Sequence, residues 1–126
     1  INIDKCSLYG CGTYGITATD SSEITVENTE IYECTYGLVE LSDCDGIKFN
    51  GCTFRDSGMF SMFVLNGCNG VSVTNSAIKN NSSSVDSYFI SAYDCSDIEF
   101  SGCDFSNNSY YNFCSGDTVK FIGCKL

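Results

Sequence analysis

A β-branched residue recurs about every 23 residues along this chain, and this repeat constrains the fold more than any other feature of the sequence. Six units begin in this way, at Ile1, Ile24, Ile47, Val71, Ile98 and Val119. A small residue stands five positions later, and a large apolar residue follows it at Leu8, Ile31, Phe54, Ile78, Phe105 and Leu126. Self-similarity with a period of this length is typical of solenoid proteins.

Apolar and polar residues alternate at the start of each unit, as in Ile24, Thr25, Val26 and Glu27, and this period of two predicts a β-strand. A Gly or Asn then shifts the phase by one residue before a second short strand. Both residue types tolerate the left-handed backbone that a sharp bend requires. A third strand is predicted at Ile16 and Ala18, Val39 and Leu41, Phe63 and Leu65, Ile90 and Ala92, and Tyr111 and Phe113.

Three short strands per unit predict one coil of a right-handed parallel β-helix, in which equivalent residues stack about 4.8 Å apart. We therefore expect an all-β solenoid of about five coils of roughly 23 residues. Residues 1–126 form a single domain in this interpretation, as a segment of a longer solenoid protein. Unit length varies between the second and third strands, where the unit from Val71 carries the extra stretch NNSSSVDSY and the unit from Ile98 is expected to be shortened.

Units such as ITVENTEIYECTYGLVELSDCDG and IKFNGCTFRDSGMFSMFVLNGCNG resemble the pectate-lyase-like right-handed β-helix repeat. The resemblance covers the whole chain and implies the fold, but it does not specify an activity. The superfamily includes pectate lyases, polygalacturonases, phage tailspikes, adhesins and carbohydrate-binding proteins. The chain has no His, so it cannot contain the His-bearing polygalacturonase motif. Lyases of this fold typically place Arg or Lys beside calcium-binding Asp residues, and here Arg55 has only Asp56 as an acidic sequence neighbour.

Composition excludes several kinds of partner. Six basic residues against 16 acidic ones give a net charge of −10, which disfavours nucleic acid and anionic membrane surfaces. The sequence contains no apolar stretch long enough for a membrane span, so no membrane insertion is expected. The absence of His also removes the usual general base and any Ser-His or Cys-His dyad.

The ten cysteines fall into the same columns as the repeat. One inward column contains Cys6, Cys52, Cys103 and Cys124, a second contains Cys44, Cys68 and Cys95, and a third contains Cys11 and Cys34. Because Ser, Thr and Gly replace Cys in these columns, we expect structural core thiols in small buried positions. Disulfides across a coil and a zinc site remain alternatives, although paired CxxC spacing is missing. Cys114 lies off register in this interpretation and is the candidate for an accessible thiol.

Cellular location is left open by these features. Free thiols suit a reducing or anaerobic cytoplasm. The N-x-S sequons at Asn80, Asn81 and Asn107 suit secretion, and an extracellular or cell-surface location is slightly favoured.

Two groups of residues are candidate binding sites. Asp20, Asp43 and Asp94 occupy equivalent turns with Asp45 nearby, and this acidic group suggests calcium as the only cofactor. The alternative is a set of solvated charges. Aromatic residues suited to sugar rings or a protein surface lie on the variable loop face, at Tyr14, Tyr36, Phe60, Tyr88 and Tyr110, and on an outer strand face, at Tyr9 and Tyr32. The alternative is that these rings cover hydrophobic loop bases.

We therefore expect a noncatalytic β-helix module that presents loops to carbohydrate or to a protein partner, with no catalytic residues of its own. One alternative is a fragment of a polysaccharide lyase or glycoside hydrolase. Another is a self-stacking, fibre-forming unit, because both ends carry the same strand pair and would pair with adjacent coils or end-to-end copies.

Overall fold

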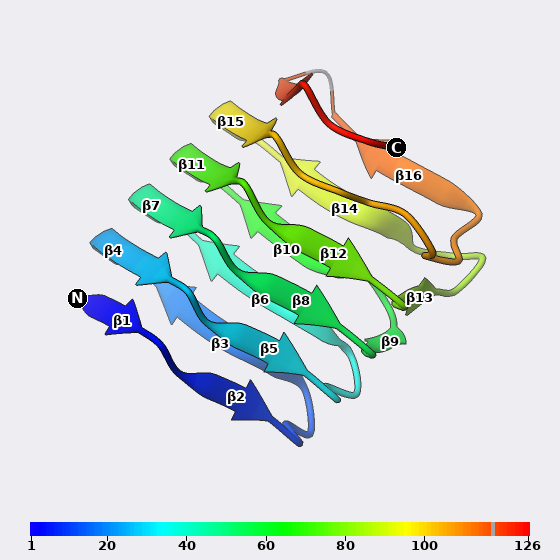
Figure 1. Cartoon of the computed structure of the whole chain (residues 1–126). Helices are drawn as coiled ribbons and strands as arrows, with labels where there is room; N and C mark the ends of the chain where they lie inside the picture. Colours follow the sequence, from blue (N-terminus) through cyan, green and yellow to red (C-terminus); the bar gives the residue numbers. More distant parts are fainter. Residues whose placement is uncertain (117) are drawn as a thin grey trace.

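The chain forms a parallel β-solenoid of about five turns in a computed structural model that describes residues 1–116 and 118–126 (Figure 1). Sheet A contains, in spatial order, β1 (Asn2–Asp4), β4 (Ser22–Glu27), β7 (Asp45–Asn50), β11 (Asn69–Thr74), β15 (Ser96–Ser101) and β17 (Val119–Ile122). Sheet B contains β2 (Ser7–Tyr9), β5 (Glu30–Tyr32), β8 (Thr53–Arg55) and β12 (Ala77–Lys79).

The third strand of each turn belongs to sheet C. This sheet contains β3 (Tyr14–Thr19), β6 (Gly37–Ser42), β10 (Phe63–Asn66), β14 (Tyr88–Tyr93) and β16 (Asn112–Ser115). A small sheet D, formed by β9 (Gly58–Met59) and β13 (Ser82–Ser83), lies in the long connection between sheets B and C. Within residues 1–116 and 118–126, no helix is long and apolar enough to cross a membrane.

Strand register follows the sequence repeat. Ile24 pairs with Ile47, Ile47 with Val71, Val71 with Ile98, and Ile98 with Val119, all in parallel. The predicted all-β parallel solenoid is therefore confirmed, as is the three-strand turn, to which sheet D adds a short fourth segment.

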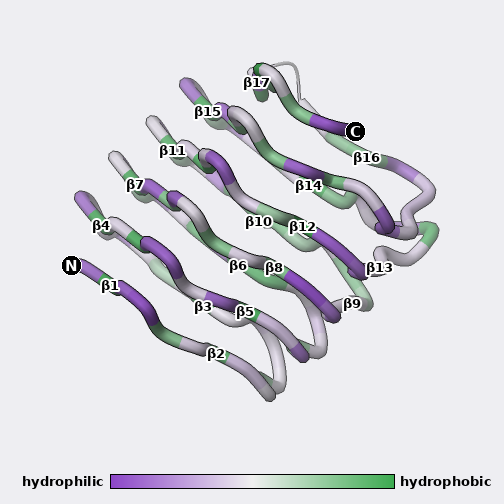
Figure 2. Tube along the Cα trace, viewed as in Figure 1, coloured by the Kyte–Doolittle hydropathy of each residue, from purple (hydrophilic) through white to green (hydrophobic). Residues whose placement is uncertain are grey.

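Aromatic side chains fill the core between the sheets. Phe49, Phe54, Phe63 and Phe100 are almost completely buried, and successive rings are 5.2–5.7 Å apart in edge-on contacts. Figure 2 shows short hydrophobic segments alternating with hydrophilic bends along the turns. Burial of these large apolar surfaces is the main stabilising term, at about 1.5–3 kcal/mol per side chain.

The bends between sheets A and B have the left-handed backbone that the sequence predicted. Asn28, Gly51, Asn75 and Gly102 have φ values of 50°, 64°, 48° and 62°. The Asn side chains also explain why the equivalent bend position one turn later is occupied by Gly. A Cβ at Gly51 would lie 3.0 Å from Asn28 Oδ1, and a Cβ at Gly102 would lie 2.7 Å from Asn75 Oδ1.

The small residue after each of these bends has a second role besides its size. Thr29 and Ser76 donate the hydroxyl hydrogen to the carbonyl two residues earlier, at 2.8 and 2.9 Å. The thiols of Cys52 and Cys103 lie 3.6 Å from the equivalent carbonyl and 3.4 and 3.3 Å from a carbonyl of the preceding turn. The hydroxyl groups also accept the N–H of the preceding turn, as Ser76 does from Cys52 at 3.1 Å. A thiol can replace a hydroxyl here because both can donate to the bend carbonyl.

A buried hydrogen-bonded column crosses several turns beside sheet B. Ser57 Oγ accepts the Cys34 N–H at 3.1 Å, and Asn81 Oδ1 accepts the Ser57 N–H at 3.0 Å. The Asn81 amide donates to the Phe54 carbonyl at 3.2 Å, and Asn81 N–H donates to Asn108 Oδ1 at 3.0 Å. Asn81 is 2% exposed, so its amide serves the fold even though it belongs to a sequon.

All ten cysteines are free thiols, and their burial depends on their turn. Five of the cysteines in the predicted core columns are buried, at Cys34, Cys44, Cys52, Cys68 and Cys103. Cys6 lies in the first turn and is exposed. Cys95 and Cys124 are only half-buried, near the end of the solenoid.

The last turn differs from the prediction in register. Cys114 pairs with Ile90 and is therefore in register, and burial raises the pKa of its thiol. The shortened connection lies after the third strand rather than before it. Cys114 precedes Val119 by 5 residues, whereas Ile90 precedes Ile98 by 8.

Candidate functional site

Three aromatic rings lie on consecutive turns at the connection between sheets B and C, and we call them the aromatic strip: Tyr14, Tyr36 and Phe60. The ring centroids of Tyr14 and Tyr36 are 6.3 Å apart, and those of Tyr36 and Phe60 are 5.0 Å apart. Backbone hydrogen bonds set this spacing, because Tyr36 N–H donates to the Thr13 carbonyl and Phe60 N–H to the Tyr36 carbonyl, both at 2.9 Å. The rings therefore form a continuous apolar surface.

The outer part of the strip is open to solvent. Phe60 is 41% exposed and its neighbour Met59 is 49% exposed, whereas Tyr14 is half-buried. Burial and the nearby Glu40 carboxylate raise the pKa of Tyr14, so its hydroxyl stays protonated at neutral pH. Gly37 lies beneath the strip, and a Cβ there would lie 2.7 Å from the Tyr14 ring. The strip can pack this closely because residue 37 has no side chain.

A shallow polar groove of about 550 Å³ adjoins the strip at Met59. Its lining residues come from two consecutive turns and are Asp56, Ser57, Gly58, Met59, Asn80, Ser82 and Ser84. The backbones of these turns approach closely at Gly58, where a Cβ would overlap the Ser82 carbonyl. Hydroxyl, amide and carboxylate groups beside exposed rings are the combination that ligand sites use to fix orientation.

Two of the predicted loop aromatics do not join the strip. The ring of Tyr110 packs against Phe89 at 5.4 Å and against Phe113 at 5.1 Å, so it covers the base of the last loop. Tyr88 is 44% exposed at the start of β14, beyond the inserted segment that includes β13. The insertion thus separates these two side chains from the strip.

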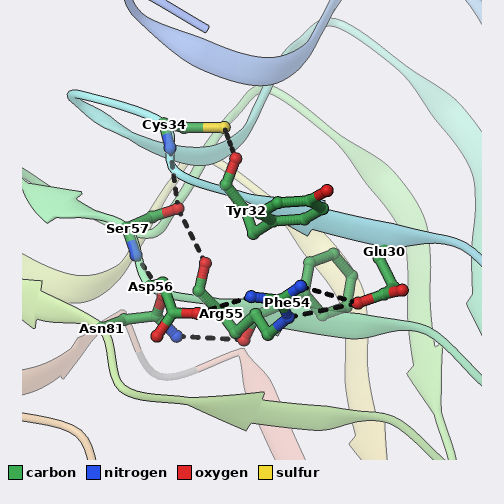
Figure 3. Close-up of polar contacts among 8 residues, drawn as sticks. All are labelled: Glu30, Tyr32, Cys34, Phe54, Arg55, Asp56, Ser57 and Asn81. Atoms are coloured by element: carbon green, nitrogen blue, oxygen red, sulfur yellow. Dashed lines mark hydrogen bonds and ion pairs between the residues drawn. The ribbon is translucent and has the colours of Figure 1, made fainter. Parts of the chain in front are cut away.

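Tyr9 and Tyr32 form a separate stack on the outer face of sheet B. Their rings are 4.9 Å apart and nearly parallel at 9°, and the Arg55 guanidinium lies 4.0 Å from the centroid of the Tyr32 ring. Figure 3 shows Arg55 between two carboxylates: Glu30 accepts from it at 3.0 Å and Asp56 at 2.6 Å. One turn further on, Lys79 pairs with an acidic side chain in the same way. Tyr9 and Tyr32 thus stack on the outer face of sheet B, and Arg55 beside them is paired with two carboxylates.

The acidic turns have a conformational role. Asp20, Asp43 and Asp94 have φ values of 51°, 53° and 55°, in the left-handed region that Asp tolerates better than most residues. A Cβ at Gly67 would lie only 2.5 Å from Asp43 Oδ1, so this carboxylate covers the glycine of the next turn. Asp45 begins β7. Residues 1–116 and 118–126 contain no group of three or more His, Cys, Asp or Glu side chains that could hold a metal ion, and calcium binding stays a prediction.

A second groove of about 370 Å³ lies on the outer face of sheet A, and the sequence analysis missed it. Gly46 and Gly70 form its floor in consecutive turns, and Lys48, Asp97 and Glu99 lie around it. The two glycines have positive φ values of 65° and 81° at the starts of β7 and β11. The Asp-Gly and Asn-Gly pairs at residues 45–46 and 69–70 were the available sequence signal.

Comparison with known proteins supports the fold. No protein-family model matches the chain, and no curated protein sequence matches it. A crystal structure of a "putative glycosyl hydrolase" from Parabacteroides merdae ATCC 43184 is similar, with a TM-score of 0.54 and 14% sequence identity. The similarity covers 94% of this chain and 76% of that one. The chain is therefore a parallel β-solenoid that resembles this protein in fold.

Proposed function

We propose that this β-solenoid is a noncatalytic carbohydrate-binding module whose site is the aromatic strip with its adjoining groove. The observation that supports this proposal is the alignment of Tyr14, Tyr36 and Phe60 on three consecutive turns, with the outer rings open to solvent. Large apolar side chains in such positions lose water contacts only when a ligand covers them. The backbone of these turns does not require aromatic residues.

The chemistry of the two surfaces suits a sugar chain. A pyranose ring has an apolar C–H face, which packs on an aromatic ring, and equatorial hydroxyls at its edge. Those hydroxyls find donors and acceptors in the groove at Asp56, Asn80 and Ser82. An amphipathic ligand of this kind uses the strip for affinity and the groove for orientation.

The test is a glycan-binding assay with matched tyrosine and phenylalanine variants. Tyr36→Ala and Phe60→Ala should each weaken binding roughly tenfold, since loss of a buried aromatic contact costs about 1–3 kcal/mol. Tyr93→Ala is the control, because Tyr93 is 73% exposed but lies at the far end of β14. Equal losses in all three variants, or no binding to any glycan by the unmodified chain, would reject the proposal.

Glycoside hydrolysis at the sheet A groove is a second candidate function. Two carboxylates, Asp97 and Glu99, line this groove, and most glycoside hydrolases use a carboxyl pair. The similarity to the Parabacteroides merdae protein gives this candidate further support. Release of reducing ends from polysaccharides, abolished by Asp97→Asn or Glu99→Gln, would establish it, and absence of turnover across a polysaccharide panel would exclude it.

A further inference from the structure

We infer that the aromatic strip and its groove bind a neutral, soluble glycan chain, and that they discriminate against polyuronates and crystalline polysaccharides. This inference rests on the proposed carbohydrate-binding function and adds the chemical class of the ligand. It follows from three observations: the charges around the groove, the ion pairs that the neighbouring cations already form, and the tilt of the aromatic rings.

The two cations that precede the groove residues in sequence are already ion-paired. Arg55 donates to Glu30 at 3.0 and 3.1 Å and to Asp56 at 2.6 Å. Lys79 lies 3.3 Å from Asp104, whose pKa falls to about 2 through hydrogen bonds from Ser106 and the charge of Lys79. A uronate carboxylate would have to displace an existing carboxylate to reach either cation. Polyanion binding needs cations that are free to form new charge-assisted contacts.

The remaining charges near the strip are negative. Asp56 lines the groove, and Glu33 occupies the equivalent left-handed turn position one turn earlier, with the same φ of 53°. Glu33 is exposed, as is Asp86 in the inserted loop. Carboxylates repel a polyuronate, and the repulsion weakens at higher salt. A neutral sugar hydroxyl can instead donate to these carboxylates.

The groove itself offers uncharged partners in the positions where a sugar needs them. Asn80, Ser82 and Ser84 contribute an amide and two hydroxyls, which can both donate and accept. Ser84 Oγ lies 3.2 Å from Ser87 Oγ, so this hydroxyl is already held in place by its neighbour. Groups of this kind discriminate hydroxyl patterns rather than charge.

The geometry of the strip also argues against a flat polysaccharide surface. The planes of Tyr14 and Tyr36 meet at 70°, and those of Tyr36 and Phe60 at 54°. A crystalline face would touch coplanar rings together, whereas tilted rings can contact only different sides of a single chain. The site therefore suits one flexible glycan chain that passes over the strip.

Calorimetric titration with oligosaccharides of equal length tests the ligand class. The probes are neutral hexasaccharides of β-linked glucose, xylose and mannose, and hexagalacturonate with and without calcium. At least one neutral probe should bind at least tenfold more tightly than hexagalacturonate at low salt, and Tyr36→Ala should reduce that binding. In a parallel sedimentation assay, microcrystalline cellulose should retain no more of the unmodified protein than of the Tyr36→Ala variant.

A charge variant tests the reason for the discrimination. Asp56→Asn should raise the affinity for hexagalacturonate relative to the neutral probe at least threefold, since it removes a groove carboxylate and one of the two carboxylates that pair with Arg55. Asp45→Asn removes the same charge at the exposed start of β7 and should leave this ratio unchanged. An unchanged ratio in Asp56→Asn would show that groove charge does not select the ligand.

Tighter binding of hexagalacturonate than of every neutral probe, with or without calcium, would overturn the inference but leave the proposed function intact. Ring-dependent binding to microcrystalline cellulose would do the same. Failure of every glycan to bind would overturn the proposed function and this inference together.

Discussion

The glycine beneath the aromatic strip offers a sharp test of how tightly successive turns approach one another. A Cβ at Gly37 would overlap the Ser61 carbonyl oxygen and would lie 2.7 Å from the Tyr14 ring. The carbonyl belongs to the backbone of the next turn, so the clash cannot be relieved by rotating a side chain. We expect Gly37→Ala to push the turn at residues 60–62 outwards.

The expected loss of stability follows from the hydrogen bonds that this turn makes. The Met62 carbonyl accepts the N–H groups of Leu38 and Val39 at 2.9 and 3.0 Å, directly beside the displaced Ser61. Overpacking of a tight site costs about 1–3 kcal/mol, and weakening of these two hydrogen bonds adds roughly 1 kcal/mol. The free energy of unfolding should therefore fall by about 2–4 kcal/mol, which lowers Tm by roughly 10 °C in a domain of this size.

Gly12→Ala is the matched control. A Cβ at Gly12 would meet nothing within 4 Å, and its φ is not positive, so this variant should be neutral or stabilised by up to about 1 kcal/mol. Thermal and urea unfolding followed by circular dichroism measure both variants. A Gly37→Ala protein as stable as the Gly12→Ala protein would refute the close approach of the two turns.

The remaining predictions concern the buried column, the buried thiols and self-association. Asn81→Leu leaves two backbone groups without a partner and should cost about 2–4 kcal/mol in urea unfolding, whereas Asn80→Gly, at an exposed left-handed position, should change stability little. Burial raises the pKa of Cys34 and of Cys103 to about 11, so the unfolded chain releases these protons from about pH 9 while the folded chain keeps them. As the pH rises from about 9 to about 11, the free energy of unfolding should fall by on the order of 1–2 kcal/mol per thiol. A flat pH profile would contradict the burial of these thiols. Sedimentation velocity tests end-to-end association, which predicts species larger than the monomer at high concentration.

The repeat made most of the fold predictable from the sequence. Equivalents of Ile47 and Phe49 recur in the neighbouring units and lie side by side in sheet A. A strand assignment that is wrong in one unit can therefore be corrected from the other units. Gly51 marks its bend because its φ of 64° is costly for most residues. Local preference and long-range register agree at these positions, and the sequence then specifies one arrangement.

The last turn was harder to predict because two neighbouring positions are both buried. Phe89 and Ile90 are both fully buried although they are adjacent residues of β14. Strict alternation therefore does not identify the inward residue at this point. Tyr111 was assigned to the position that pairs with Ile90, but Cys114 lies there, and Tyr111 is exposed while Phe113 stacks on Phe89.

The site was only partly predictable for a different reason. The contacts of a loop aromatic depend on which residues pack beside it, and one sequence does not specify them. Tyr36 and Tyr110 looked equivalent in the repeat, yet Tyr36 contacts Phe60 on the surface and Tyr110 covers Phe89. β13 lies between the two in the loop column, where it pairs with β9 and bridges to Ser109 and contributes serines instead of an aromatic ring.

Backbone geometry accounts for much of the acidic character of the chain, and this changes which residues deserve a functional interpretation. Asp20, Asp43 and Asp94 stand where the turn requires positive φ, so their presence needs no ligand. The small residues of the core columns are likewise explained by the bend carbonyls they bind. No comparable requirement applies to Tyr36 or Phe60, whose backbone hydrogen bonds any residue except Pro could make. Rings at such positions expose apolar surface without helping the turn to form, and this supports the proposed ligand contact.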